Sequence, residues 1–267
     1  MTRTAAKKPA WVIAKERSRR EAAAETIWLF GLHAVRDALQ NKARAALELV
    51  VTRNAADRLG PLVEAAGIRA RIVDARRFDA PLDPGSVHQG AALEVRPLAW
   101  GALDAFCAAG PGSVVLLLDR VTDPHNAGAI LRSAEVFGAR AVIAPQRHSA
   151  PESGALAKAA SGALERQPYL RVPSLAAAME ALRGMGYGLV GLDGAAEASL
   201  DAALAGAGRP LGIVLGAEGP GLRARTRALC EVLARIPAAG GFGSLNVSNA
   251  AAVALYAANA AARGGGG

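Results

Sequence analysis

The sequence has few residues that could hold a metal ion or form a covalent framework. Its 267 residues include two cysteines and four histidines, and Cys107 and Cys230 stand far apart without a partner-like spacing. A disulfide scaffold is therefore excluded, and a cysteine-based zinc site is disfavoured. No other group of side chains has the spacing of metal ligands, so we expect no metal.

Long hydrophobic segments are also missing. No run of about twenty apolar residues is present, as a membrane-spanning helix requires. Residues 1–25 have no apolar stretch of the kind found in signal peptides. Together with the two unpaired cysteines, this favours a cytoplasmic protein that does not enter a membrane. Aromatic residues make up 4% of the chain against 52% for all hydrophobic residues, so the core must consist mainly of Ala, Val and Leu.

Negative charge is scarce. The 23 Asp and Glu are outnumbered by 31 Lys and Arg, which gives a net charge of +8 and a pI of about 10.2. This excess favours a polyanionic partner, nucleic acid above all. Residues 1–25 carry seven of the basic residues and three glutamates. We expect a disordered basic tail there, which is either a solvated arm or an additional contact to RNA phosphates. A short Gly tail is expected at 264–267.

Residues 26–97 have the pattern of a small α/β domain. Strands and helices are predicted to alternate in the order β-α-β-α-β, followed by an extended run. The predicted strands are 27–30, 47–52, 70–73 and 87–95, and the predicted helices are 32–40 and 55–66. Residues 98–112, with several glycines and Pro111, have the composition of a linker.

Residues 113–263 alternate more regularly and predict a second, larger α/β domain. The continuous apolar run 114–119 is typical of a strand buried on both faces of a parallel sheet. Such a doubly wound sheet has right-handed crossovers, helices on both faces, and its ligand site beyond the carboxyl ends of the strands. Further strands are predicted at 141–144, 169–172, 187–192, 211–215 and 232–236, and helices at 126–137, 154–164, 174–184, 221–229 and 245–262.

Three segments rich in Gly or Asn follow predicted strands at that edge. The first is DPHNAGAILRSAEVFGA at 123–139, in which Asp123 and Pro124 have the order of a helix N-cap and a first-turn proline. Asn126 then lies at the start of the helix, and Arg132 lies further along it. From residue chemistry alone, Asn126 is a turn residue and Arg132 is a surface cation paired with Glu135.

The second segment, LGAEGPGL at 215–222, lacks the Lys-Ser/Thr of a phosphate-binding loop and the fingerprint of a dinucleotide-binding turn. A nicotinamide cofactor is therefore disfavoured. Gly216, Gly219 and Gly221 indicate a backbone that turns sharply and lets a flat ligand approach closely. Glu218 either bonds neighbouring amides or contacts a substrate.

The third segment, IPAAGGFGSLNVSNAAAVALY at 236–256, joins a glycine-rich loop to the last predicted helix. Ser244 has the type and position of the N-cap of that helix. Asn246 and Asn249 are three residues apart and therefore share a helix face. Ser244 and Asn246 are either caps or site residues.

Taken together and in this order, the three segments resemble the signature motifs of the SpoU (TrmH-like) RNA ribose methyltransferases, a family of the SPOUT type. Asn126, Gly128 and Arg132 match its N-x-G-x-x-x-R motif, and residues 216–221 match G-x-E-G-x-G. Residues 244–248 read S-L-N-V-S, as in the family, whereas Asn249 replaces a residue that is usually small and apolar. WLFGLHAVRDAL at 28–39 and VHQGAALEV at 87–95 look like the two ends of the family's L30e-like substrate-binding domain.

The resemblance covers about residues 27–260 and implies both a fold and a reaction. The fold is an α/β sheet whose C-terminal chain forms a trefoil knot, preceded by the small L30e-like α/β domain. The reaction is methyl transfer from S-adenosylmethionine to a ribose 2′-hydroxyl of RNA. The catalytic residues implied are Asn126, Arg132, Glu218, Ser244 and Asn246, and those implied to contact the cofactor are Gly216, Ile236 and Leu245. Because a guanidinium rarely releases a proton, we expect Arg132 to orient the nucleotide and stabilise the forming alkoxide.

The resemblance also implies a homodimer whose partner is ribosomal RNA. Members with the L30e-like domain most resemble bacterial enzymes that methylate a guanosine of 23S rRNA. One alternative is a transfer-RNA guanosine methyltransferase, although members of that type usually carry short basic helical extensions in place of the front domain. Another is a non-catalytic RNA-binding factor of ribosome assembly.

Overall fold

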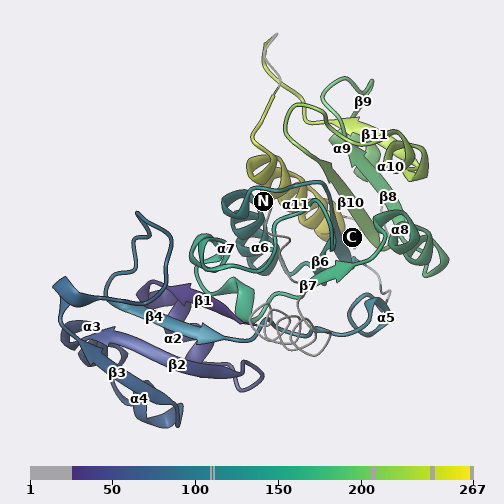
Figure 1. Ribbon diagram of the computed structural model, residues 1–267. Coiled ribbons are helices and arrows are strands. Elements are labelled where there is room, and N and C mark those ends of the chain that lie inside the picture. The colour runs from purple at the N-terminus through teal and green to yellow at the C-terminus, as the bar shows by residue number, and fades with distance from the viewer. Residues whose placement is uncertain (1–25, 109, 111, 206–208, 241–243, 265–267) are drawn as a thin grey trace, which may run out of the picture.

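The computed structural model describes residues 26–108, 110, 112–205, 209–240 and 244–264. The predicted basic tail 1–25 and the last three residues of the predicted Gly tail lie outside these ranges; Gly264 ends the last helix. The described chain forms two β-sheets, one from its first third and one from the remainder (Figure 1). Among the described residues, no helix combines the length and the apolar composition needed to cross a bilayer.

The first sheet has four strands in the order β1-β4-β2-β3. Strand β4 is antiparallel to β1 and β2, whereas β2 and β3 are parallel. The strands are β1 (Ile27–Phe30), β2 (Ala46–Thr52), β3 (Arg69–Val73) and β4 (Ala91–Val95), and the helical segments are α2 (Leu32–Gln40), α3 (Arg53–Leu59), α4 (Pro61–Ala65) and the 3₁₀ turn η1 (Ala75–Arg77).

Two predicted boundaries in this part of the chain are wrong. The single helix expected at 55–66 is two helices, because Gly60 has a φ of 55° and Pro61 starts a new helix where its missing N–H costs nothing. The strand expected at 87–95 begins only at Ala91, since Gln89 and Gly90 both have positive φ and form a turn.

The second sheet has seven strands in the order β7-β6-β5-β10-β8-β11-β9, and every pairing within it is parallel. This confirms the predicted α/β class and the mostly parallel sheet. The strands are β5 (Val114–Asp119), β6 (Ala141–Pro145), β7 (Tyr169–Val172), β8 (Gly188–Leu192), β9 (Ala198–Ser199), β10 (Leu211–Gly216) and β11 (Val232–Arg235).

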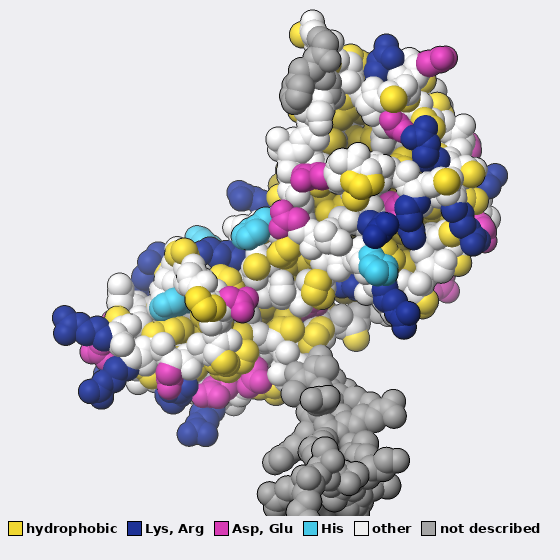
Figure 2. Space-filling view, turned by 45° about the horizontal axis from the view of Figure 1, so that its top comes forward, with side chains coloured by type: hydrophobic (Ala, Val, Ile, Leu, Met, Phe, Trp, Pro, Cys, Tyr) yellow, Lys and Arg dark blue, Asp and Glu magenta, His cyan; other side chains and the backbone are white. Residues whose placement is uncertain are grey.

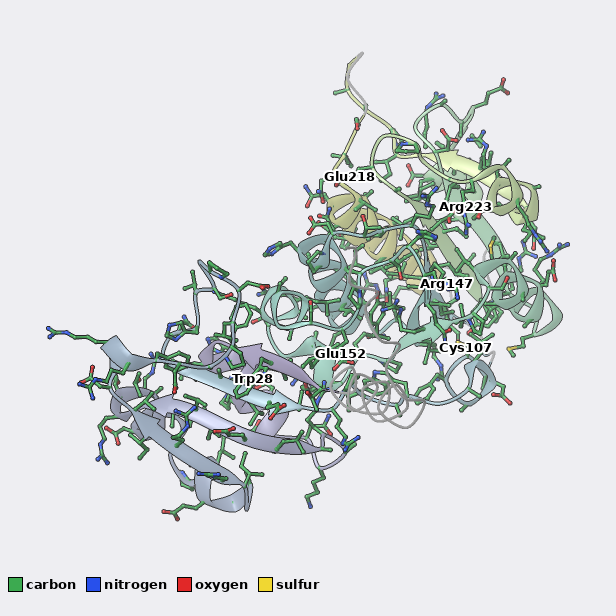
Figure 3. All side chains as sticks on the ribbon, in the orientation of Figure 1. Trp28, Cys107, Arg147, Glu152, Glu218 and Arg223 are labelled. Carbon is green, nitrogen blue, oxygen red and sulfur yellow. The ribbon has the colours of Figure 1, made fainter. Side chains whose placement is uncertain are left out.

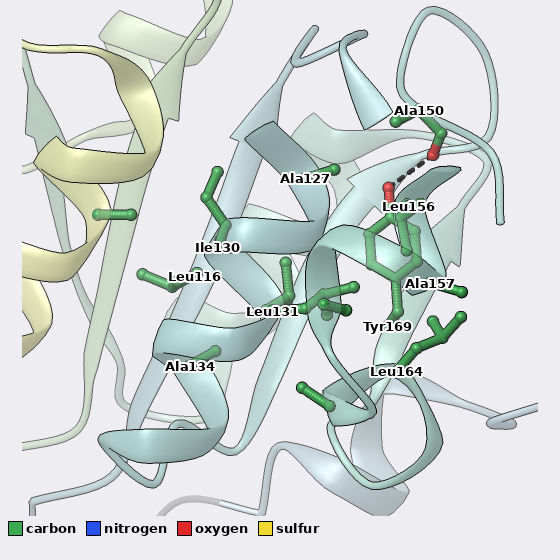
Figure 4. Packing of buried hydrophobic residues seen from close by; sticks show 14 of the residues in the cluster. Leu116, Ala127, Ile130, Leu131, Ala134, Ala150, Leu156, Ala157, Leu164 and Tyr169 are labelled. Atoms are coloured by element: carbon green, nitrogen blue, oxygen red, sulfur yellow. Dashed lines mark hydrogen bonds between the residues drawn. The ribbon is translucent and has the colours of Figure 1, made fainter. Parts of the chain in front are cut away.

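Helices pack on both faces of this sheet, and strand β5 shows why it must be apolar throughout. Leu116 and Leu118 join the core under α6, α7 and α11, whereas Leu117 joins the core under α8 on the other face. Figure 4 shows the side chains of α6 over the sheet in the first of these cores. The helical segments are α5 (Leu103–Phe106), α6 (Pro124–Val136), α7 (Gly154–Ala160), η2 (Ala163–Glu165), α8 (Leu175–Gly184), α9 (Leu200–Leu204), α10 (Ala224–Leu229) and α11 (Val247–Gly264).

Three departures from the predicted elements occur in this part. The helix expected at 154–164 ends at Ala160, because Ser161 is left-handed and Gly162 faces the carboxylate of Asp37 at a distance no Cβ could tolerate. The helix expected from 221 begins at Ala224, since the residues before it form a turn. The short β9 and α9 and the one-turn α5 were not predicted.

A buried charged cluster joins the two sheets. The side chain of Arg44, which follows α2, is 0% exposed and donates to both oxygens of Glu165 at 2.7 and 3.0 Å. The same guanidinium pairs with Glu152 and donates to the carbonyl of Arg96 at 2.8 Å. Burial raises the pKa of Glu152 even beside this cation. Gly154 completes the contact, since its α-carbon lies against β1 with no room for a side chain.

Arg44→Met is expected to lower the free energy of unfolding by about 3–5 kcal/mol, because two carboxylates remain buried without their cation. The deficit should shrink as the pH falls, because burial raises the pKa of Glu152 and its protonation then removes the unpaired charge. Arg71→Met is the control: it breaks the exposed pairs with Asp79 and Glu48, and we expect a much smaller loss of stability because water screens these charges. Urea unfolding of both variants measures the difference, and equal losses would contradict the role given to Arg44.

Candidate active site

A cleft of about 1180 Å³ opens at the carboxyl ends of β8, β10 and β11. The turns that follow these three strands form most of its wall, and the residues leading into α11 close it. Gly216, Ile236 and Leu245, the residues expected to contact the cofactor, all line this cleft. Three of the five expected catalytic residues line it as well: Glu218, Ser244 and Asn246.

One carboxylate joins three distant segments of the chain at the cleft. Oε1 of Glu218 accepts from Nδ2 of Asn126 at 3.0 Å and from Nδ2 of Asn246 at 2.7 Å. Nδ2 of Asn246 also lies 3.0 Å from Oδ1 of Asn126, which accepts from it. We call these three residues the amide–carboxylate triangle. Glu218 therefore bonds side-chain amides from two other segments and not the backbone amides of its own loop.

Local sequence fixes the Asn126 corner of the triangle. Asp123 caps α6 by accepting from the backbone N–H of His125 at 2.9 Å, and Pro124 occupies the first helical position, as predicted. Gly128, one turn further on, packs so closely on α7 that a Cβ would lie 2.5 Å from the carbonyl oxygen of Leu156. The cap and this packing together fix where the first turn of α6 presents Asn126.

Asn246, and not Ser244, caps the last helix, which corrects the prediction. Oδ1 of Asn246 accepts from the backbone N–H of Ser248 at 2.9 Å and from its hydroxyl at 2.6 Å. Helix α11 accordingly starts at Val247. The cap uses the oxygen of the side chain and leaves its nitrogen for Glu218. Ser244 is exposed at the cleft and makes no hydrogen bond among the described residues.

The Gly-rich loop after β10 turns back on itself and is anchored beneath. Ala217 and Gly221 form an isolated bridge, and Gly219 and Gly221 have φ of 80° and 68°. Below the loop, the carboxylate of Asp119 is 0% exposed and accepts from Nε of Arg223 at 2.7 Å and from its backbone N–H at 2.9 Å. Figure 3 labels Glu218 and Arg223, which this loop carries.

Arg132 stands apart from the other expected site residues. It is exposed on α6, does not line the cleft, and makes no hydrogen bond or ion pair among the described residues. Its expected alternative partner, Glu135, instead pairs with Arg166, which also binds Asp37 of α2 at 3.0 Å. The structure thus brings Glu218, Ser244 and Asn246 to one cleft, joins Asn126 to two of them through hydrogen bonds, and leaves Arg132 apart.

Other chemistries find little support in the described part of the chain. Burial raises the pKa of both Cys107 and Cys230 to about 11, so neither thiol is ionised at neutral pH. No group of three or more His, Cys, Asp or Glu within these ranges could hold a metal ion. His88 stacks on Phe78 and accepts from the backbone N–H of Gly90, which is a packing role.

The anchor formed by Asp119 and Arg223 was not predicted from the sequence. The signal for it is an acidic residue at the end of a wholly apolar strand, a position where a carboxylate is buried and needs a partner. The ion pair of Asp193 and Arg227, which lines the cleft, was not predicted either. These two residues lie in segments that carry no motif.

The chain belongs to the SpoU rRNA methylase family. The family model described as "SpoU rRNA Methylase family" matches residues 113–256, and one described as "RNA 2'-O ribose methyltransferase substrate binding" matches residues 28–100. The 23S rRNA (guanosine-2'-O-)-methyltransferase RlmB of Vibrio vulnificus is 38% identical over 86% of this chain and 94% of its own length. The RlmB of Bordetella pertussis is 39% identical over 87% of this chain and 96% of its own.

A solved structure has the same fold over almost its whole length. The SpoU methyltransferase AviRb from Streptomyces viridochromogenes, in complex with the cofactor AdoMet, superposes with a TM-score of 0.76. The match covers 91% of this chain and 92% of that one at 24% sequence identity.

Gly216→Ala is expected to destabilise the protein by about 1–3 kcal/mol, because the new methyl group would lie 2.3 Å from the backbone carbonyl carbon of Gly221. Gly240→Ala is the matched control: it lines the same cleft, and a Cβ there meets nothing within 4 Å. Thermal unfolding compares the two variants. Equal melting temperatures would show that the loop is not folded back as described.

Proposed function

We propose that this protein transfers a methyl group from S-adenosylmethionine to the ribose 2′-hydroxyl of a guanosine in 23S rRNA, acting in the cytoplasm. The observation that carries the proposal is the amide–carboxylate triangle at the mouth of the cleft, in a chain 38% identical to an RlmB enzyme over most of its length. The match extends over both sheets, so it includes the part of the chain that meets RNA in this proposal as well as the part that holds the donor.

The residues of the cleft fit the methyl donor. Leu215, Ile236, Leu245 and Val247 offer an apolar wall to an adenine ring, and the glycines beside them expose backbone groups for its polar edge. The carboxylate of Glu218 in the lining suits a positively charged sulfonium, whereas the charge of Asp193 is balanced by Arg227. When bound, S-adenosylmethionine supplies an activated methyl group, and no metal is required for its transfer.

The chain's own contribution is positioning and charge stabilisation. The triangle holds Glu218 through Oε1 and leaves Oε2 without a hydrogen-bond partner among the described residues. We assign that oxygen to the ribose hydroxyl, whose attacking oxygen it orients, and Ser244 to the neighbouring sugar or phosphate. Asn126 and Asn246 keep the carboxylate in place by donating to it.

In this proposal the first sheet binds the RNA and the second carries out the methyl transfer. We propose that residues 26–97 form the L30e-like domain that holds the folded RNA by shape and phosphate contacts. Residues 98–112 serve as the linker, and residues 113–263 form the methyltransferase domain, in which the C-terminal chain passes through an earlier loop as a trefoil knot. The Arg44 cluster keeps the two sheets at a fixed separation, so RNA held by the first reaches the cleft in one register.

We further propose that the protein is a homodimer and that Arg132 completes the site of the partner. Val136, Val253 and Tyr256 are 72%, 41% and 60% exposed, and Tyr256 packs edge-on against Phe137, so they form one apolar surface over α6 and α11. Arg132 is four residues before Val136 and shares its helix face. A second copy that covers this surface therefore also covers Arg132, which the cleft of its own chain does not use.

Incubation with labelled S-adenosylmethionine and unmodified 23S rRNA should place the label on the 2′-oxygen of a guanosine, mapped by nuclease digestion and mass spectrometry. Asn246→Asp should keep the helix cap yet lower the rate about 100-fold, because a carboxylate replaces the donor that faces Glu218. Asn249→Asp, an equal change of charge one turn away, should leave the rate unchanged. Label on a base, or equal rates for the two variants, would contradict the proposal.

Arg132→Ala is expected to abolish activity without affecting stability, because the side chain has no partner among the described residues. If each site uses Arg132 of the other copy, mixing Arg132→Ala with Asn246→Asp subunits after unfolding and refolding restores one intact site in each mixed dimer. Random mixing then recovers about a quarter of the wild-type activity. No recovery, with mixed dimers shown by native mass spectrometry, would place Arg132 in the site of its own chain.

A further inference from the structure

A second, basic cleft lies at the same edge of the large sheet. Its volume is about 270 Å³, and its charged walls come from three places: the loop after β6, the loop after β10 and the start of α10. Arg147, His148, Arg223 and Arg225 all line it, together with Ser174 at the start of α8. Figure 2 shows Arg, Lys and His side chains gathered on one side of the lobe that holds the large sheet.

The loop that carries Arg147 and His148 is held from below. The guanidinium of Arg171 donates to the carbonyls of Pro145, Gln146 and Ala150 at 3.3, 2.7 and 2.9 Å. The hydroxyl of Tyr169 donates to the carbonyl of Ala150 at 2.7 Å, as Figure 4 shows. The two tip residues are consequently presented by a fixed backbone, with His148 in the left-handed region at a φ of 60°.

Among the described residues, the cationic side chains of this cleft make few ion pairs with the protein itself. Arg147 and His148 are exposed and make no hydrogen bond or ion pair among the described residues. Arg223 binds Asp119 through Nε and its backbone N–H, and its side chain is half exposed, with no hydrogen bond from either terminal nitrogen among the described residues. Arg225 is 76% exposed and lies 3.6 Å from Glu180, a weak pair. Since α8 begins here, its N-terminus adds partial positive charge on the same side.

The loop after β10 separates this cleft from the methyl-transfer cleft. Residues 216–221 line the latter, and Arg223, two residues on, lines the basic cleft. The phosphates that flank a ribose are bonded to its own 3′ and 5′ oxygens, so a ribose that approaches Glu218 brings its phosphates close to the loop between the two clefts. Guanidinium groups that keep two nitrogens available bind phosphate oxygens through paired hydrogen bonds.

We propose that Arg147, His148, Arg223 and Arg225 form a phosphodiester-binding pocket that holds the RNA backbone beside the nucleotide whose ribose enters the methyl-transfer cleft. This inference rests on the proposed function for its substrate. The contacts bind phosphate and therefore fix the register of the RNA, while they carry no information about the base. These contacts would fix the RNA backbone next to the reacting ribose, whereas the N-terminal sheet would bind the RNA farther from it.

The test compares Arg147→Gln and the Arg147→Gln/Arg225→Gln double variant with Arg183→Gln. Arg183 is exposed and unpartnered within the described ranges, and it lies at the opposite end of α8 from the basic cleft. For the double variant we expect KM for rRNA to rise about 10-fold or more, with kcat and the affinity for S-adenosylmethionine preserved. The slope of log affinity against log salt concentration should fall by about 1 for each phosphate contact removed. Arg183→Gln should change none of these quantities.

Two outcomes would overturn the proposal. One is an equal loss of RNA affinity in Arg183→Gln, which would mean a diffuse effect of net charge. The other is unchanged RNA affinity in the double variant together with lost binding of inorganic phosphate, which would mean a site for a small anion. Should the wild type bind RNA with this dependence on Arg147 yet transfer no methyl group, the pocket stands and the proposed activity fails.

Discussion

The carboxylate of Glu218 holds together the three chain segments of the proposed active site. Three segments that are distant in the sequence end at the same edge of a parallel sheet, but a shared edge only brings them near one another. Glu218 accepts hydrogen bonds from the side-chain amides of Asn126 and Asn246, and these bonds fix the positions of the three segments relative to one another. Each of the three side chains satisfies part of the hydrogen-bonding capacity of the others, so a change at one corner releases the other two.

Two buried charges hold the segments around the site in place. Buried Asp119 anchors the loop of Glu218 through Arg223, and buried Arg44 anchors the N-terminal sheet through two carboxylates. In each case a charge that would be costly to bury alone is stabilised by partners from another segment. Long-range polar contacts and an aliphatic core thus fix the backbone around the site. The side chains that we assign to RNA are exposed groups carried by that backbone.

Much of the fold was readable from the sequence because its signals are local. The apolar run that became β5, the Asp123-Pro124 cap of α6 and the repeated succession of strands and helices each reflect chemistry within a few residues. The boundaries that failed also had local causes, such as the break at Gly60, but the sequence does not say which glycine takes a positive φ. The motifs named the residues of the triangle, although the bonds between them became visible only in the structure.

The sequence could not show which of several possible partners a polar side chain would bind. Glu135 was available to Arg132 on its own helix, yet it pairs with Arg166 from another element, and Arg132 has no partner in the part of the chain that the structure describes. Ser244 and Asn246 were both suitable caps for α11, and only the fold decides that Asn246 takes that place while also binding Glu218. Nothing in the sequence indicated the buried Arg44 cluster. Arg44 lies more than a hundred residues before Glu152 and Glu165, and the three residues belong to no motif.

The most direct test of this account is hydrogen exchange, followed by mass spectrometry, on Glu218→Ala beside the wild type. Because one carboxylate ties the three segments together, its loss should raise exchange at once in residues 120–128, 216–222 and 244–249, while the N-terminal sheet stays unchanged. Faster exchange confined to residues 216–222 would contradict it, since the other two segments would then be held in place without Glu218.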